Sequence, residues 1–151
     1  MISLNEVYEE RGKFKMLTIS EPYLKKGKNK SVRLCSIVNY EGKDEEIWYE
    51  VDEKYSEYLC YERADAFLLG FLPYAMAFKH NIKVEGAISE RLFYHLKNYY
   101  IPAVAKFSNY YKKIDIFYHS LDETDYGGGG SRYRFFRGSR FILYRIKTFG
   151  L

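Results

Sequence analysis

The distribution of charge along the chain limits where a folded domain can lie. All 20 Asp and Glu residues and 18 of the 24 Lys and Arg residues fall in residues 1–126, which gives that part a net charge of −2. Residues 127–151 hold the other 6 basic residues and no acid, and their basic residues are mostly Arg where the earlier ones are mostly Lys. We therefore predict one domain at 1–126, followed by a Gly-rich linker and a flexible, disordered, Arg-rich tail at 127–151.

Composition excludes several classes of protein. A chain of 151 residues with 47% hydrophobic residues is long enough for one globular core. No apolar run reaches the ~20 residues of a membrane span, so no membrane partner is expected. Cys35 and Cys60 are too few for a disulfide scaffold or a four-thiolate zinc site. Without a signal peptide, we expect reduced thiols in a cytoplasmic protein.

The sequence offers no recognisable catalytic or metal-binding motif. His80, His95 and His119 stand apart from one another and from the cysteines, so their spacing does not suit a metal site. No Gly-x-Ser-x-Gly, His-Glu-x-x-His or intact Walker-type loop occurs. We therefore predict no catalytic residue and no metal ligand in this chain.

The hydrophobic pattern predicts strands first and mixed elements later. Phe14–Ser20 and Ser31–Tyr40 are rich in β-formers and flank the turn-rich stretch Lys25–Lys30, which predicts a hairpin. Glu45–Val51 continues as a third strand after a Gly-containing turn at 41–44. The later elements expected are a helix at Lys54–His80 broken or kinked at Pro73, a strand at Ile82–Glu85, a helix from Ser89 to Phe107 split at Pro102, and a strand at Lys113–Tyr118.

This order predicts an α/β fold with a small mixed sheet, in which an N-terminal β-hairpin or meander is followed by β-α-β-α-β. Its last strand, helix and strand form a parallel crossover unit. Ligands of such sheets bind at the carboxyl ends of the strands. The polar residues predicted at that edge are Glu85, Ser89, Glu90 and Arg91 on the strand-to-helix turn, with Glu62, Arg63 and Asp65 opening another helix.

Two interpretations of these seven residues remain. They can bind a ligand, or they can cap helices and form salt bridges with one another, and the second interpretation is favoured. Tyrosines at 94, 99, 100, 110 and 111 could stack on bases, but their helical spacing favours core and rim positions. Nucleic acid is therefore not an expected partner of the domain.

Four segments resemble a known family. Tyr49–Leu59, Glu62–Phe67, Leu72–Met76 and Ile88–Leu96 are similar to the N-terminal region of bacterial adenine nucleotide alpha-hydrolase-like (PP-loop ATP pyrophosphatase) proteins, across about half of the chain. Such proteins are often met in surface-polysaccharide clusters. In that family a Ser-Gly-Gly-x-Asp-Ser loop follows and cradles the pyrophosphate of ATP, with Mg²⁺ bridging phosphates. This chain carries unrelated residues there, at Arg137–Arg140, so no ATP-site residue is carried over.

The expected loop is nevertheless compatible with another reading frame. If each codon from Arg132 to Tyr144 is shifted by one base, its permitted bases admit Gly-Thr-Gly-Phe-Ser-Gly-Gly-Val-Asp-Ser-Phe-Tyr-Thr. A tract of G bases encoding Gly127–Gly130 would be prone to slippage. We hypothesise that the chain from about 128–131 onward is translated out of frame.

The resemblance implies a truncated N-terminal domain of an ATP-dependent adenylating protein, ligase-like or amidotransferase-like, that is not catalytic as it stands. ATP and Mg²⁺ are expected only for the full-length relative, and no cofactor is expected for this chain. The alternative is a small binding protein that uses its Arg-rich, aromatic tail on RNA or an acidic partner. An uncovered sheet edge at the last strand also predicts a homodimer.

Overall fold

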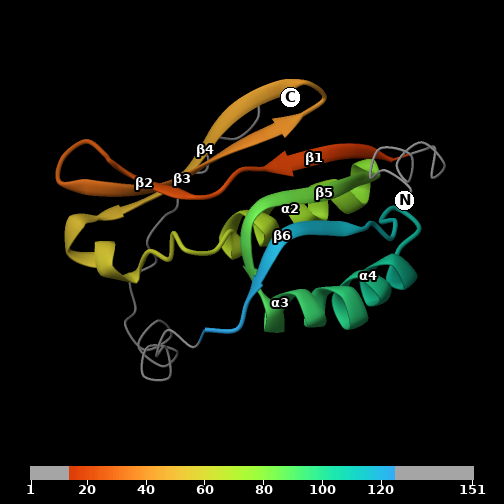
Figure 1. Ribbon diagram of the computed structural model, residues 1–151. Helices are drawn as coiled ribbons and strands as arrows, with labels where there is room; N and C mark the ends of the chain where they lie inside the picture. The colour runs from red at the N-terminus through yellow and green to blue at the C-terminus, as the bar shows by residue number, and fades with distance from the viewer. Residues whose placement is uncertain (1–13, 125–151) are drawn as a thin grey trace, which may run out of the picture.

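The computed structural model of the chain describes residues 14–124 (Figure 1). The boundary predicted at residue 126 and the tail at 127–151 lie outside these residues. The elements, in chain order, are β1 (Lys15–Ile19), β2 (Tyr23–Lys26), β3 (Ser31–Tyr40), β4 (Lys43–Asp52), the 3-10 helix η1 (Glu53–Tyr58), α2 (Asp65–Phe78), β5 (His80–Ser89), α3 (Glu90–His95), the π-helical segment η2 (Leu96–Tyr100), α4 (Ile101–Phe107) and β6 (Ile116–Asp122). The predicted α/β class with a mixed sheet is confirmed.

Strand β3 organises the antiparallel part of the sheet. One edge of β3 pairs with β4 over its whole length, and the other edge pairs first with β2 and then with β1. The predicted antiparallel pairing of Phe14–Ser20 with Ser31–Tyr40 is thus correct as β1 with β3, but the chain between them forms the additional strand β2. Lys25 was expected in a turn and instead belongs to β2, where its Nζ lies 3.1 Å from the Glu46 carboxylate of β4. This cross-strand ion pair favours an extended chain at a position that looked like turn sequence.

Strands β1, β5 and β6 form the parallel part of the sheet. β5 pairs with both β1 and β6, and the helical run α3, η2 and α4 connects β5 to β6, as the predicted crossover requires. β5 is longer than the predicted Ile82–Glu85 because it continues past Gly86, where a Cβ atom would lie 3.2 Å from the Cα of Glu21. A side chain at this position would require the Glu21 backbone to move slightly away from β5.

The single helix predicted at Lys54–His80 is wrong. The chain first makes η1, whose start is capped by the Asp52 carboxylate, which accepts a hydrogen bond from the Lys54 N–H at 3.1 Å. After η1 the chain passes beside the end of β5, and there the Ala64 N–H donates to the Ala87 carbonyl at 2.9 Å. Because that N–H bonds to a strand, residues 59–64 cannot continue the helix, and α2 begins only at Asp65. Pro73 lies inside α2 and does not divide it.

The helices pack on one face of the sheet and form a two-layer structure. Sheet residues such as Leu17 and Ile82 share one buried cluster with Phe67 of α2 and Ile101 of α4. Gly70 of α2 allows β4 to approach, because a Cβ there would lie 2.8 Å from the Tyr49 hydroxyl. Figure 1 places α3 and α4 in a row beside β6, away from the arm formed by β2, β3 and β4. Across residues 14–124, no helix has both the length and the apolar character needed to cross a membrane.

Candidate functional site

Arg63 and Asp122 join the segment before α2 to the carboxyl end of β6. The Arg63 Nε donates to the Asp122 Oδ2 at 2.8 Å, and both side chains are only 16% exposed. A second nitrogen of Arg63 donates to the Thr124 carbonyl oxygen. The other carboxylate oxygen of Asp122 accepts from the Thr124 N–H at 2.8 Å. The guanidinium therefore fixes the chain as it leaves the sheet.

Asp65 and Ser89 make the second connection at the same edge. The Asp65 Oδ1 accepts from the Ser89 N–H at 2.8 Å, which ties the first turn of α2 to the end of β5. The Ser89 Oγ in turn accepts from the Leu92 N–H at 3.2 Å, so the predicted N-cap of the following helix is present. Burial raises the pKa of Asp65, and the hydrogen bond from Ser89 and the charge of Arg63 oppose that rise.

The remaining predicted residues are not part of this connection. Glu85 is exposed on β5 and lies 3.8 Å from the Lys83 ammonium. Glu90 and Arg91 are exposed in the first turn of α3. Glu62 is exposed beside Cys60, and burial together with the Glu62 carboxylate raises the pKa of that thiol. A raised pKa opposes thiolate formation, so Cys60 has no activated-nucleophile character.

The carboxyl edge of the parallel strands, formed by Arg63, Asp65, Ser89 and Asp122, serves as a structural clamp. In this clamp the Arg63 guanidinium already donates to Asp122 and Thr124. The carboxylates of Asp65 and Asp122 would repel an anion. The described residues of this edge therefore do not fit the phosphates of ATP by themselves. Of the predicted residues, Ser89 caps α3, Arg63 forms its ion pair with a residue outside the seven, and Asp65 accepts a hydrogen bond from the Ser89 backbone. Ligand binding by the seven residues stays a prediction.

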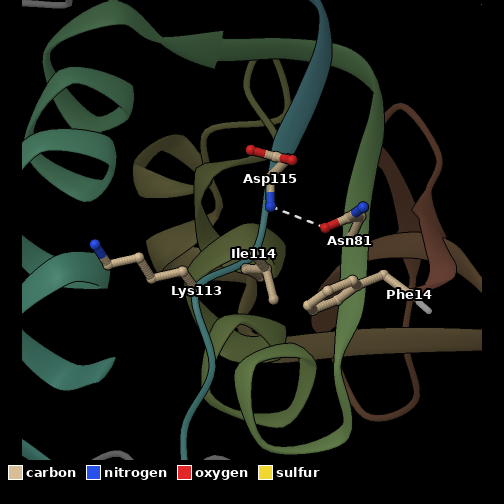
Figure 2. A pocket seen from close by; sticks show the side chains of 5 residues that line it. All are labelled: Phe14, Asn81, Lys113, Ile114 and Asp115. Atoms are coloured by element: carbon tan, nitrogen blue, oxygen red, sulfur yellow. Dashed lines mark hydrogen bonds between the residues drawn. The ribbon is translucent and has the colours of Figure 1, made fainter. Parts of the chain in front are cut away.

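The opposite edge of the same strands has a cavity. Figure 2 shows Phe14, Asn81, Lys113, Ile114 and Asp115 around an open space of about 390 Å³. The Asn81 Oδ1 accepts from the Asp115 N–H at 2.9 Å, so its acceptor already serves the backbone. Because this cavity lies at the amino ends of β5 and β6, it is not where α/β sheets bind ligands. We assign it no function.

His80 is the buried polar side chain that sequence analysis did not single out for the core. It is 3% exposed, and within residues 14–124 neither ring nitrogen has a hydrogen-bond partner. Burial lowers the pKa of His80, so the ring is neutral at pH 7. Residues 14–124 contain no group of three or more His, Cys, Asp or Glu side chains placed to hold a metal ion.

Two features of the surface differ from the sequence-based expectation. Asp122 was not among the predicted site residues, because the last strand was predicted to end at Tyr118 and in the structure continues to Asp122. The tyrosines at 94, 99, 100 and 110 were expected in core and rim positions, yet they are between 42% and 62% exposed. Tyr111 is half-buried and packs against the core, so the expectation of a core position holds for this one of the five tyrosines.

No family model, no curated protein and no solved structure matches the chain. The fold and the clamp are therefore interpreted on their own geometry.

Proposed function

We propose that residues 14–124 are the N-terminal domain of a cytoplasmic, ATP-pyrophosphatase-type adenylating protein, ligase-like or amidotransferase-like. Its acceptor would be a surface-polysaccharide precursor. In this proposal the chain itself is not catalytic, because its phosphate-binding loop is out of frame. ATP and Mg²⁺ would belong to the in-frame protein only.

One observation carries the proposal. β6 is a parallel strand at the end of the sheet order, and its carboxyl end directs the chain toward the edge where α/β proteins bind nucleotides. The glycine run at Gly127–Gly130 begins within a few residues of that end, and the alternative frame from Arg132 admits the phosphate loop. A loop encoded there would follow a parallel strand, as a phosphate-binding loop requires.

The alternative is a small binding protein whose C-terminal tail binds RNA or an acidic partner. That tail lies outside the described residues. This alternative stays a hypothesis based on composition alone. The two functions differ in the codons and in the response to ATP.

The first prediction concerns the gene and its corrected product. We expect the codons of Arg132 to Tyr144, read one base later, to encode the Ser-Gly-Gly-Val-Asp-Ser loop and an open frame beyond it. A protein expressed from the restored frame should bind Mg·ATP by calorimetry and release pyrophosphate when supplied with an acceptor. The chain described here should bind no ATP.

The matched control is the restored protein with the serines of its loop changed to alanine, which should lose ATP binding while keeping its circular dichroism spectrum. Codons that do not encode the loop would refute the proposal. ATP binding by the present chain through its own C-terminal residues would also refute it.

The second prediction concerns self-association through β6. Among the described residues, no further strand pairs with β6, and its sequence from Ile116 to Leu121 carries no Lys, Arg, Asp or Glu. The opposite edge strand β4 is protected by many charges. We propose that two copies associate along β6. Ser120→Lys, which adds a charge to an exposed position of this edge, should therefore shift the protein from dimer to monomer in sedimentation velocity.

Tyr58→Lys adds the same charge to an exposed position of η1 and should leave the dimer intact. An unaltered chain that sediments as a monomer at high concentration would contradict this assembly.

A further inference from the structure

One side of the molecule combines positive charge with exposed aromatic rings. We call it the α3–α4 surface and define it as the exposed side chains of residues 91–113. This stretch contains five Lys and Arg residues and His95, and no Asp or Glu. A second stretch, residues 22–40, also carries five Lys and Arg residues and no Asp or Glu, but there Lys25 pairs with Glu46 and Arg33 pairs with Glu50. On the α3–α4 surface no Lys or Arg side chain forms an ion pair within residues 14–124, so this positive charge is available to a polyanion.

Three lysines of this surface meet at one hollow. Lys106, Lys112 and Lys113 line an open depression of about 430 Å³ together with Pro102, Ala105 and Tyr111. None of the three lysines forms an ion pair with any residue of 14–124. The Lys112 N–H donates to the Met76 carbonyl of α2 at 2.9 Å, which holds the turn after α4 in place. The hollow therefore gathers three positive charges that an anion would complement.

The same stretch of residues carries exposed aromatic rings. Tyr94 and Tyr99 are 53% and 59% exposed, with ring centroids 5.9 Å apart. Residues five apart face each other here because η2 is a π-helical turn, which brings residue i beside residue i+5. Phe107, the last residue of α4, is 94% exposed, and Tyr110 in the turn after it is 62% exposed. Exposed rings of this kind provide flat faces on which bases can stack.

We propose that the α3–α4 surface binds single-stranded nucleic acid. Lysines without carboxylate partners would contact the phosphates, and the tyrosines would stack on the bases. An unstacked strand suits the surface better than a duplex, since a duplex keeps its base faces covered. This inference does not depend on the ATP chemistry proposed above, and it places the binding on the helical layer and not on the tail.

The test measures binding of the full chain to fluorescent oligo-uridine RNA and oligo-thymidine DNA of about 15 nucleotides by anisotropy, over a range of salt concentrations. The first variant carries Lys106→Gln, Lys112→Gln and Lys113→Gln together. Losing up to three phosphate contacts should flatten the slope of log affinity against log salt by about 2. The matched control carries Lys26→Gln, Lys28→Gln and Lys30→Gln at exposed positions of β2 and the turn after it, and should keep the parental slope.

The second variant carries Tyr94→Ala and Tyr99→Ala. Loss of stacking should weaken binding roughly tenfold or more while leaving the salt slope unchanged. Circular dichroism checks that each variant is folded. RNA and DNA binding would both support the proposal, and their ratio would reveal whether the 2′-hydroxyl contributes.

Four results would overturn the proposal. The first is no binding by the parental chain. The second is an equal loss of affinity in the lysine variant of the α3–α4 surface and in the lysine control, which would indicate binding through overall positive charge. The third is no loss of affinity in either variant of the α3–α4 surface, which would assign binding to the tail. The fourth is heparin binding as tight as RNA binding with no effect of the tyrosine changes, which would indicate an acidic polysaccharide.

Discussion

Replacing Phe67 by alanine should lower the free energy of unfolding by about 3–5 kcal/mol. Phe67 is fully buried on α2, and its ring centroid lies 5.2 Å from that of Tyr49 on β4. It therefore fills the space between the helical layer and the antiparallel part of the sheet. Truncation leaves a cavity that β4 cannot close, because the Tyr49 hydroxyl is held by the Ala66 carbonyl at 3.1 Å. A loss of this size is a large part of the stability of a small domain.

Urea unfolding followed by fluorescence measures the effect, because Trp48 is the one tryptophan of the chain and lies on β4. The Arg33 guanidinium lies 4.1 Å from the centre of its ring, a contact that unfolding breaks. Phe107→Ala is the matched control. It removes the same side chain from a position 94% exposed, so its effect should stay within about 0.5 kcal/mol. Equal losses in the two variants would contradict the packing described for α2.

Replacing Arg63 by methionine should cost about 2–3 kcal/mol at pH 7, because it leaves the Asp122 carboxylate without its ion-pair partner at 16% exposure. The Asp65 carboxyl, whose pKa burial already raises, also loses a charge that opposes the rise. The pKa of Asp65 should therefore rise further in the variant. Protonating Asp65 relieves its repulsion by the Asp122 carboxylate, so the loss of stability should be smaller near pH 5 than at pH 7.

The measurement is urea unfolding at both pH values. Lys83→Met is the control, because the Lys83–Glu85 pair is about half exposed on both sides and 3.8 Å apart, so its removal should have little effect at either pH. A loss for Arg63→Met that grows as the pH falls would contradict the role assigned to the clamp.

Local patterns predicted much of the fold. Alternating residues fixed β3 at its observed bounds, and the hydroxyl of Ser89 marked the start of α3. These features depend on neighbours in the sequence, which is why the sequence alone revealed them. Pro102, by contrast, does not split the second long helix as predicted: it lies in the first turn of α4, and the irregularity of that helix is the π-helical turn η2 at Leu96–Tyr100.

Contacts between distant segments caused the errors. The break between η1 and α2 depends on Ala87, and the extension of β5 through Gly86 depends on space beside Glu21. The last strand was predicted at Lys113–Tyr118 and lies at Ile116–Asp122, because the Asp115 N–H bonds to the Asn81 side chain before the ladder begins. At the clamp, Arg63, Asp65 and Ser89 were predicted together, but Asp122 was missed because its partner precedes it by 59 residues.

The shared edge of β3 has a consequence for how the protein folds. The hairpins made by β2, β3 and β4 need only short loops to close, whereas Lys15 of β1 has its parallel neighbour at His80. On the ribosome the antiparallel arm can therefore form, with β1 resting on the end of β3, while the residues of β5 are still being synthesised. Until β5 arrives, β1 exposes a row of amides, and that stage of biogenesis is when a chaperone would be most useful.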